Sequence, residues 1–234
     1  MPAMRAGQSR SRLVPTRLAC GVMAGPLFVS GFAVFGARRA GYDWRSQPVS
    51  SLAIGRGGWL QRANFILAGA SYCVAARGLA KSPRLAVGPR AVPALIFGVG
   101  GGLVGSGVFV TDPVAGFPPS SRDQDVADRA LPVGPTRGGK LHTLCAIPIF
   151  AGIPATALTC AASAARRGQY RWATYSAGSA IVMTGAFVLF GVAFGGVPRL
   201  AGQGGIFQRI SIMTGFGWLS ALSVRALASA APTM

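Results

Sequence analysis

The sequence is poor in side chains that bind cofactors: it has no glutamate, few lysines and a single histidine, His142. Bis-histidine haem needs two histidines, and membrane zinc hydrolases gather several, so the sequence excludes both classes by count. A calcium loop that closes with glutamate is excluded as well. The sequence also lacks a phosphate-binding loop ending in Gly-Lys-Ser or Gly-Lys-Thr. We therefore expect neither a cofactor nor a bound metal.

Cysteine is scarce, and its spacing carries no metal or disulfide signal. No two cysteines form a C-x-x-C pair, so the sequence predicts neither a zinc site nor a disulfide framework. All four lie inside apolar segments, at Cys20, Cys73, Cys145 and Cys160. We expect them to behave as small apolar side chains.

Charged residues are also scarce, at 12% of the 234 residues, whereas apolar residues make up 51%. The mean hydropathy is +0.46. The charges are grouped, and the runs between them have about the 20 residues that a helix needs to cross a bilayer core. A lipid-facing segment must satisfy its own backbone hydrogen bonds, and the alternating pattern of a β-barrel is absent. The sequence therefore predicts an all-α, polytopic transmembrane bundle.

Six apolar segments predict six transmembrane helices in a single domain over residues 18–228. We expect these helices at residues 18–36, 63–80, 92–110, 141–162, 173–197 and 209–228. Residues 1–17 are expected to form a disordered basic tail, and residues 229–234 a short C-terminal tail. Pro148 and Pro154 should bend the fourth helix.

The net charge of +18 predicts a partner of negative charge. Most basic residues flank apolar segments, so anionic lipid headgroups are the expected partner. Nucleic acid is not, since no basic stripe with a groove-reading motif occurs. Basic residues are nearly balanced between the two sides, but the tail and the compact basic loops favour cytoplasmic termini in a cell membrane.

The expected third helix is unusually rich in glycine. Gly98 with Gly102 and Gly101 with Gly105 form two G-x-x-x-G pairs. Such pairs let helix backbones approach closely in a membrane. We therefore expect these four glycines to lie on a helix-packing face.

Polar residues from two loops should meet at one end of the bundle. With six helices, the loops at 37–62 and 111–140 lie on the same side of the membrane, whichever way the protein inserts. Asp112 follows a helix C-terminus, where the dipole disfavours a carboxylate by about 0.3–1 kcal/mol. His142 lies near a helix N-terminus, which favours the neutral ring. A contact between Asp112 and His142 would suit both, so we take them, with Asp43 and Asn64, as candidate ligand-binding residues.

Each of these residues also has a purely structural interpretation. An Asp-Pro pair after a helix is common turn chemistry, and a single interfacial histidine is more often a hydrogen-bonded structural residue than a catalyst. The loop at 111–140 has three other acidic residues. We expect these residues, Asp123, Asp125 and Asp128, to form a solvated surface.

Three functions remain open. The sequence favours a non-enzymatic protein whose extracytoplasmic polar face binds a lipid headgroup, a small molecule or a partner protein. The alternative is a membrane enzyme acting on a lipid or envelope precursor, with His142 as base and Asp112 orienting it. A small transporter is the third, weakened because no charge lies deep within a helix.

Several short motifs, taken in order, resemble the DUF998 family of bacterial integral membrane proteins. They are Gly-Tyr-Asp at 41–43, Ser-Ser-Leu at 50–52, Asn64 with Gly69, the run 107–113 and the run 138–142. The resemblance implies six transmembrane helices and supplies no reaction, since the function of that family is unknown. The family pattern has Ser-Glu-Leu where this chain has Ser50-Ser51-Leu52, so any chemistry of that glutamate would be missing here.

Overall fold

The computed structural model describes residues 2–82, 90–118, 135–195 and 197–230. Within these residues every regular element is a helix, which confirms the all-α prediction. The helices are α1 (Pro2–Arg38), α2 (Trp59–Leu79), α3 (Ala91–Val108), α5 (Arg137–Phe150), α6 (Gly152–Ala165), α7 (Tyr170–Phe194) and α8 (Gly204–Ala230). A short 3₁₀ helix, η1 (Val49–Ala53), lies between α1 and α2. The loop acids Asp123, Asp125 and Asp128 lie outside the described residues.

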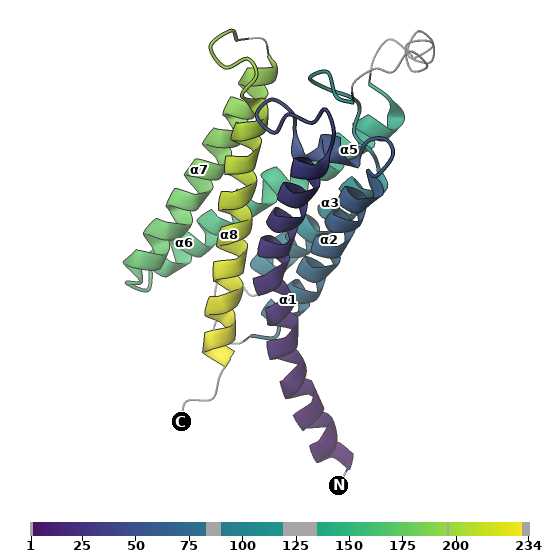
Figure 1. Cartoon of the computed structure of the whole chain (residues 1–234). Helices are drawn as coiled ribbons and strands as arrows, with labels where there is room; N and C mark the ends of the chain where they lie inside the picture. The colour runs from purple at the N-terminus through teal and green to yellow at the C-terminus, as the bar shows by residue number, and fades with distance from the viewer. Residues whose placement is uncertain (1, 83–89, 119–134, 196, 231–234) are drawn as a thin grey trace.

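Each of the six expected helices has a counterpart, with ends that differ by a few residues. The largest difference is at the N-terminus, where residues 2–17, expected as a disordered tail, continue α1 as helix. Figure 1 shows this part of α1 extending past the other helices.

Five spans in the described part of the chain are long and apolar enough to cross a membrane. They comprise α1, α3, α5 together with α6, α7 and α8. The helix α2 is not among them, because Gln61, Arg62, Asn64 and Arg77 lower its hydropathy. It is nevertheless long enough for a span, and it packs against both α1 and α3.

The expected fourth helix is divided at Ala151, between Pro148 and Pro154. Proline has no N–H to donate and its ring clashes with the preceding turn. The bend that these prolines predict is therefore present as a break between α5 and α6.

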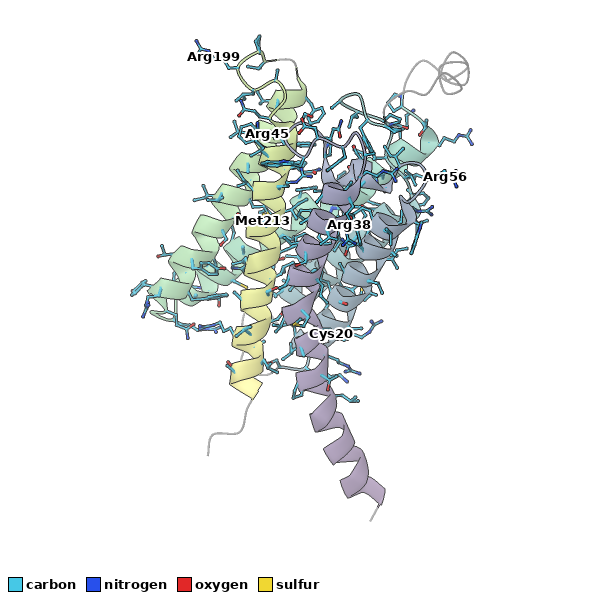
Figure 2. The ribbon with its side chains drawn as sticks, viewed as in Figure 1. Cys20, Arg38, Arg45, Arg56, Arg199 and Met213 are labelled. Carbon is cyan, nitrogen blue, oxygen red and sulfur yellow. The ribbon has the colours of Figure 1, made fainter. Side chains whose placement is uncertain are left out.

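The helices form a closed ring of neighbours. In order around it, α2 lies between α1 and α3, α3 packs on α5 and α6, α6 packs on α7, and α8 joins α7 to α1. The described parts of the loops that join α1 to α2, α3 to α5 and α7 to α8 lie at one end, whereas α1 begins and α8 ends at the other (Figure 1). Arg45, Arg56 and Arg199 lie toward the loop end, whereas Met213, farther down α8, is 53% exposed as expected beside lipid (Figure 2).

Only half of the expected glycine face packs against other helices of this chain. A Cβ on Gly102 would lie 2.5 Å from the Cys145 carbonyl oxygen, and one on Gly105 would overlap the Cys145 sulfur, so both glycines bring α3 close to α5. A Cβ on Gly98 or Gly101 would meet no atom within 4 Å. These two glycines therefore lie outside the face of α3 that packs against α5 and α6.

Candidate functional site

The loop end of the bundle carries a structured cover, which we call the outer cap: residues 39–58, including η1, together with residues 109–118. The two segments contact each other, because Gln47 Nε2 donates to the Ala115 carbonyl at 3.2 Å. The ring of the buried Phe117 also packs edge-on against that of Tyr42, with centroids 5.3 Å apart. The outer cap is therefore one unit built from two loops.

Arg209 of α8 ties the outer cap to the bundle. Its guanidinium donates to the Tyr42 hydroxyl at 2.5 Å, the Gln47 carbonyl at 3.1 Å and the Gly205 carbonyl at 2.9 Å. Tyr42 in turn donates to the Pro48 carbonyl at 2.9 Å. Burial raises the pKa of Tyr42 above its ordinary value although Arg209 opposes the shift, so the hydroxyl stays protonated at neutral pH.

Two further hydrogen bonds fix the cap to the start of α8. The Val49 N–H donates to Gln208 Oε1 at 2.7 Å, and the Ile206 N–H donates to the Arg45 carbonyl at 3.0 Å. Gln208 and Val49 are both buried. Backbone groups of the cap are thus satisfied by α8 rather than by water.

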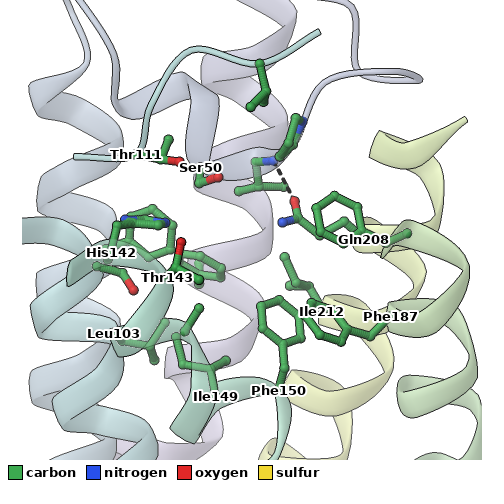
Figure 3. Close-up of a pocket in the computed structure, with 18 of the residues that line it drawn as sticks. Ser50, Leu103, Thr111, His142, Thr143, Ile149, Phe150, Phe187, Gln208 and Ile212 are labelled. Atoms are coloured by element: carbon green, nitrogen blue, oxygen red, sulfur yellow. Dashed lines mark hydrogen bonds between the residues drawn. The ribbon is translucent and has the colours of Figure 1, made fainter. Parts of the chain in front are cut away.

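A cavity of about 310 Å³ lies beneath the outer cap. All the bundle helices except α6 contribute to its lining, as do both segments of the cap. Figure 3 shows that polar side chains gather near the cap and apolar side chains line the deeper end. The polar group is Ser50, Ser106, Thr111, His142, Thr143 and Gln208, and the deeper group includes Leu103, Ile149, Phe150, Phe187, Ile212 and Phe216. The cavity is therefore amphipathic along its length.

Two side chains at the polar end have a hydrogen-bonding atom without a partner. The Ser106 hydroxyl is 1% exposed and has no hydrogen-bond partner. Gln208 uses its Oε1 for Val49, while its Nε2 points into the cavity without a partner (Figure 3). Buried polar atoms are almost always paired, so such groups need an explanation.

His142 lies on the cavity wall and is hydrogen-bonded to α3. Its Nδ1 is 2.9 Å from the Phe109 carbonyl oxygen. Because a carbonyl oxygen only accepts, Nδ1 carries the hydrogen in this contact, which leaves Nε2 as an acceptor in the neutral ring. The ring also packs edge-on against Phe65, with centroids 6.2 Å apart.

Asp112 has a different partner from the one we expected. Its carboxylate accepts from the Thr136 N–H at 3.1 Å and from the Thr136 hydroxyl at 2.5 Å. Thr136 is the N-cap of α5, and its hydroxyl oxygen accepts from the Gly139 N–H at 3.0 Å. The expected Asp112–His142 hydrogen bond is not formed. Asp112 instead orders the first turn of α5, the helix that carries His142.

The other two candidate residues lie away from the cavity. Asp43 is exposed in the outer cap and accepts from the Ser46 hydroxyl at 2.6 Å and the Arg45 N–H at 3.0 Å. These bonds hold the pKa of Asp43 below its ordinary value, so it is ionised at neutral pH. Asn64 Nδ2 donates to the Phe28 carbonyl at 3.0 Å and so joins α2 to α1.

The cavity opens between α5 and α7. Two of its lining residues are exposed, Thr143 on α5 and Phe194 on α7, which is 41% exposed. Below them, α6 packs along α7 and the Phe150 and Phe187 rings stack with centroids 4.0 Å apart. These two exposed residues therefore place the opening near the loop end, on the outer surface of the bundle.

None of the described residues that line the cavity is Asp, Glu, Lys or Arg. The part of the chain that the structure describes also holds no group of three or more metal-ligating side chains. The arrangement suits noncovalent binding of an amphipathic molecule, with hydrogen bonds near the cap and apolar contacts below.

Sequence reasoning missed the residues that define this site. The sequence places Ser106 within a glycine-rich packing helix, Gln208 at the end of a loop and Arg209 at the start of the last helix, with no further role for any of them. A weak signal was available: Gln208 and Arg209 directly precede an apolar run on the same side as Asp43. Nothing in the sequence pairs them with Val49 and Tyr42.

A family model described as "Protein of unknown function (DUF998)" matches residues 22–225. No curated protein and no solved structure matches the chain.

Proposed function

The chain belongs to the DUF998 family, whose description assigns no activity, and from that premise we propose that this multi-pass membrane protein binds an amphipathic lipid in the cavity beneath the outer cap. The role is non-enzymatic. The lipid chain occupies the apolar end, and the polar group lies against Ser106, His142 and Gln208. We place this end on the extracytoplasmic side, with both termini in the cytoplasm.

The observation that carries the proposal is the amphipathic cavity with exposed lining residues on α5 and α7. In a membrane-spanning bundle we expect this outer surface to face lipid. Its volume of about 310 Å³ is at the lower end of the range for ligand pockets, roughly 300–1,000 Å³. Such a volume suits one hydrocarbon chain with a small polar group. The aromatic side chains at its apolar end offer large contact areas to that chain.

Catalysis by Asp112 and His142 receives less support from the geometry. A base needs an orienting partner, yet both carboxylate oxygens of Asp112 already accept hydrogen bonds from Thr136. His142 donates to a backbone carbonyl, which holds its ring in place. Transport receives less support too, because the cavity has no charged lining residue among those described.

The test is to fill the cavity without removing any polar group. Ala146 is half-buried on α5 and lines the cavity, so Ala146→Phe places a ring inside it. We expect the purified wild-type protein to retain lipid in native mass spectrometry, and the variant to lose most of it.

The matched control is Ala155→Phe. Ala155 is exposed on α6 and does not line the cavity, so this variant should retain lipid as the wild type does. Equal retention by Ala146→Phe and Ala155→Phe, or a wild-type protein that retains none, contradicts the proposal.

A further inference from the structure

We infer that the lipid bound beneath the outer cap is a single-chain lipid whose polar group is an uncharged oxygen, a hydroxyl or an ester carbonyl, and that Ser106 and Gln208 select it. This inference rests on the proposed lipid-binding function and adds the chemical class of the ligand to it.

The charge of the site is the first argument. The cavity-lining residues in the described ranges include no Asp, Glu, Lys or Arg. A charged headgroup inside it would lose its water without gaining an opposite charge, which is strongly unfavourable. An uncharged polar group loses much less on entering.

The cation that follows Gln208 in the chain is already occupied. Arg209 donates to Tyr42, Gln47 and Gly205, and its guanidinium lies 5.8 Å from the centre of the Phe32 ring. It does not line the cavity. The carboxylate of Asp112 likewise already accepts two hydrogen bonds from Thr136. Neither residue is free to neutralise a charged ligand.

The unpaired polar atoms are the second argument, and they point to hydrogen bonding. Ser106 Oγ is buried and unpartnered, and Gln208 Nε2 points into the cavity with its N–H groups unused (Figure 3). An uncharged oxygen accepts from Gln208 Nε2. A hydroxyl or an ester carbonyl also accepts from the Ser106 hydroxyl. Both kinds of group therefore satisfy what the protein leaves open.

The size of the cavity limits the ligand to one chain. The stacked rings of Phe150 and Phe187 line its apolar end. Its volume of about 310 Å³ is small for a ligand pocket. If a lipid with two chains bound here, its second chain would remain in the bilayer and the lipid would pass through the opening between α5 and α7.

The experiment compares three probes with the same hydrocarbon chain: oleyl alcohol, methyl oleate and oleyl phosphate. Each is added at the same mole fraction to nanodiscs that hold the full-length protein, and bound probe is counted by native mass spectrometry. We expect the two uncharged probes to bind at least about tenfold more tightly than oleyl phosphate. A stronger response to oleyl alcohol than to methyl oleate identifies a hydroxyl as the preferred group, and the reverse identifies an ester carbonyl.

The variant Ser106→Ala tests the residue assignment. Loss of one hydrogen bond between uncharged groups should weaken binding of the preferred uncharged probe about fivefold. The matched control is Ser51→Ala, because the Ser51 hydroxyl is also buried and unpartnered but does not line the cavity. This control should bind as the wild type does. Circular dichroism and gel filtration of both variants establish that they fold.

The outcomes separate this inference from the proposed function. Oleyl phosphate binding as tightly as the uncharged probes overturns the inference and leaves lipid binding intact. An unchanged affinity in Ser106→Ala overturns the role of Ser106. Binding of none of the three probes contradicts the proposed function itself.

Discussion

At the scale of single residues, Asp112 holds the start of α5 through Thr136, and Gly139 makes room for its carboxylate. A Cβ on Gly139 would overlap the Asp112 carboxylate. The variant Gly139→Ala should therefore displace Asp112, break its two bonds to Thr136 and destabilise the protein by about 2 kcal/mol. Thermal unfolding in detergent, followed by circular dichroism, measures the loss.

The neighbouring glycine provides the control. A Cβ on Gly138 would lie 3.4 Å from the Val110 carbonyl oxygen, an ordinary contact. Gly138→Ala should stay within about 1 kcal/mol of the wild type, since alanine also favours helix. Equal losses in both variants would show that Asp112 does not order α5.

Arg209 is the residue on which the outer cap depends most. Replacing it with alanine removes the two hydrogen bonds that its charged guanidinium donates to the cap, at Tyr42 and Gln47, so Arg209→Ala should destabilise the cap locally by about 3 kcal/mol. Hydrogen exchange should then accelerate in residues 42–53. The control is Arg199→Ala, at the same end of the bundle with an exposed side chain. If exchange in residues 42–53 is unchanged in Arg209→Ala, the cap is held by other contacts.

At the scale of elements, the opening between α5 and α7 determines how a ligand reaches the cavity. Thr143 is exposed on α5 and lines this opening. Thr143→Trp should block it and slow uptake of a fluorescent single-chain lipid at least about tenfold, with little change in stability, because exposed positions tolerate substitution. Stopped-flow fluorescence in liposomes measures the rate.

Leu144 tests whether the effect belongs to the opening. It is 59% exposed on the same helix but does not line the cavity. Leu144→Trp should take up lipid at the wild-type rate. If uptake slows equally in both variants, the effect comes from a bulky residue on the surface of α5 and not from a blocked opening.

The helices themselves could be predicted from the sequence, because long uncharged runs and their basic ends are local signals. A bend from Pro148 and Pro154 was predicted too, since each proline acts on its own turn, but the division into two helices at Ala151 was not. The packing of α3 was predicted only in part. Gly98 and Gly101 match the same motif as Gly102 and Gly105, and only tertiary structure decides which of the four meets α5.

At the scale of the whole molecule, the loop positions define two ends, and the proposed orientation places the outer cap outside the cell. Arg56 is exposed in the cap, and Arg167 is exposed in the turn between α6 and α7 at the opposite end. In intact cells a membrane-impermeant maleimide should label Arg56→Cys, and should label Arg167→Cys only after permeabilisation. Wild-type protein reports background labelling of the native cysteines, which lie within helices. The reverse pattern would invert the orientation.

The candidate site could not be predicted from the sequence, because the residues that form it are far apart along the chain. Tyr42 and Arg209 are 167 residues apart, and Val49 and Gln208 are 159 apart. Their contacts appear only when α8 closes the ring beside α1. That the two loops of the cap lie at the same end of the bundle was predictable, because alternating loops share an end. The cavity was not, because it forms where six helices and the cap fail to fill space completely.

An opening toward lipid has a consequence for how occupancy is controlled. A ligand that enters between α5 and α7 comes from the leaflet, so its relevant concentration is its mole fraction among the surrounding lipids. Diluting a proteoliposome suspension with buffer leaves that fraction, and therefore occupancy, unchanged. Fusing the same proteoliposomes with inert lipid lowers both. The protein would then report the composition of its own leaflet and remain indifferent to the volume of water around it.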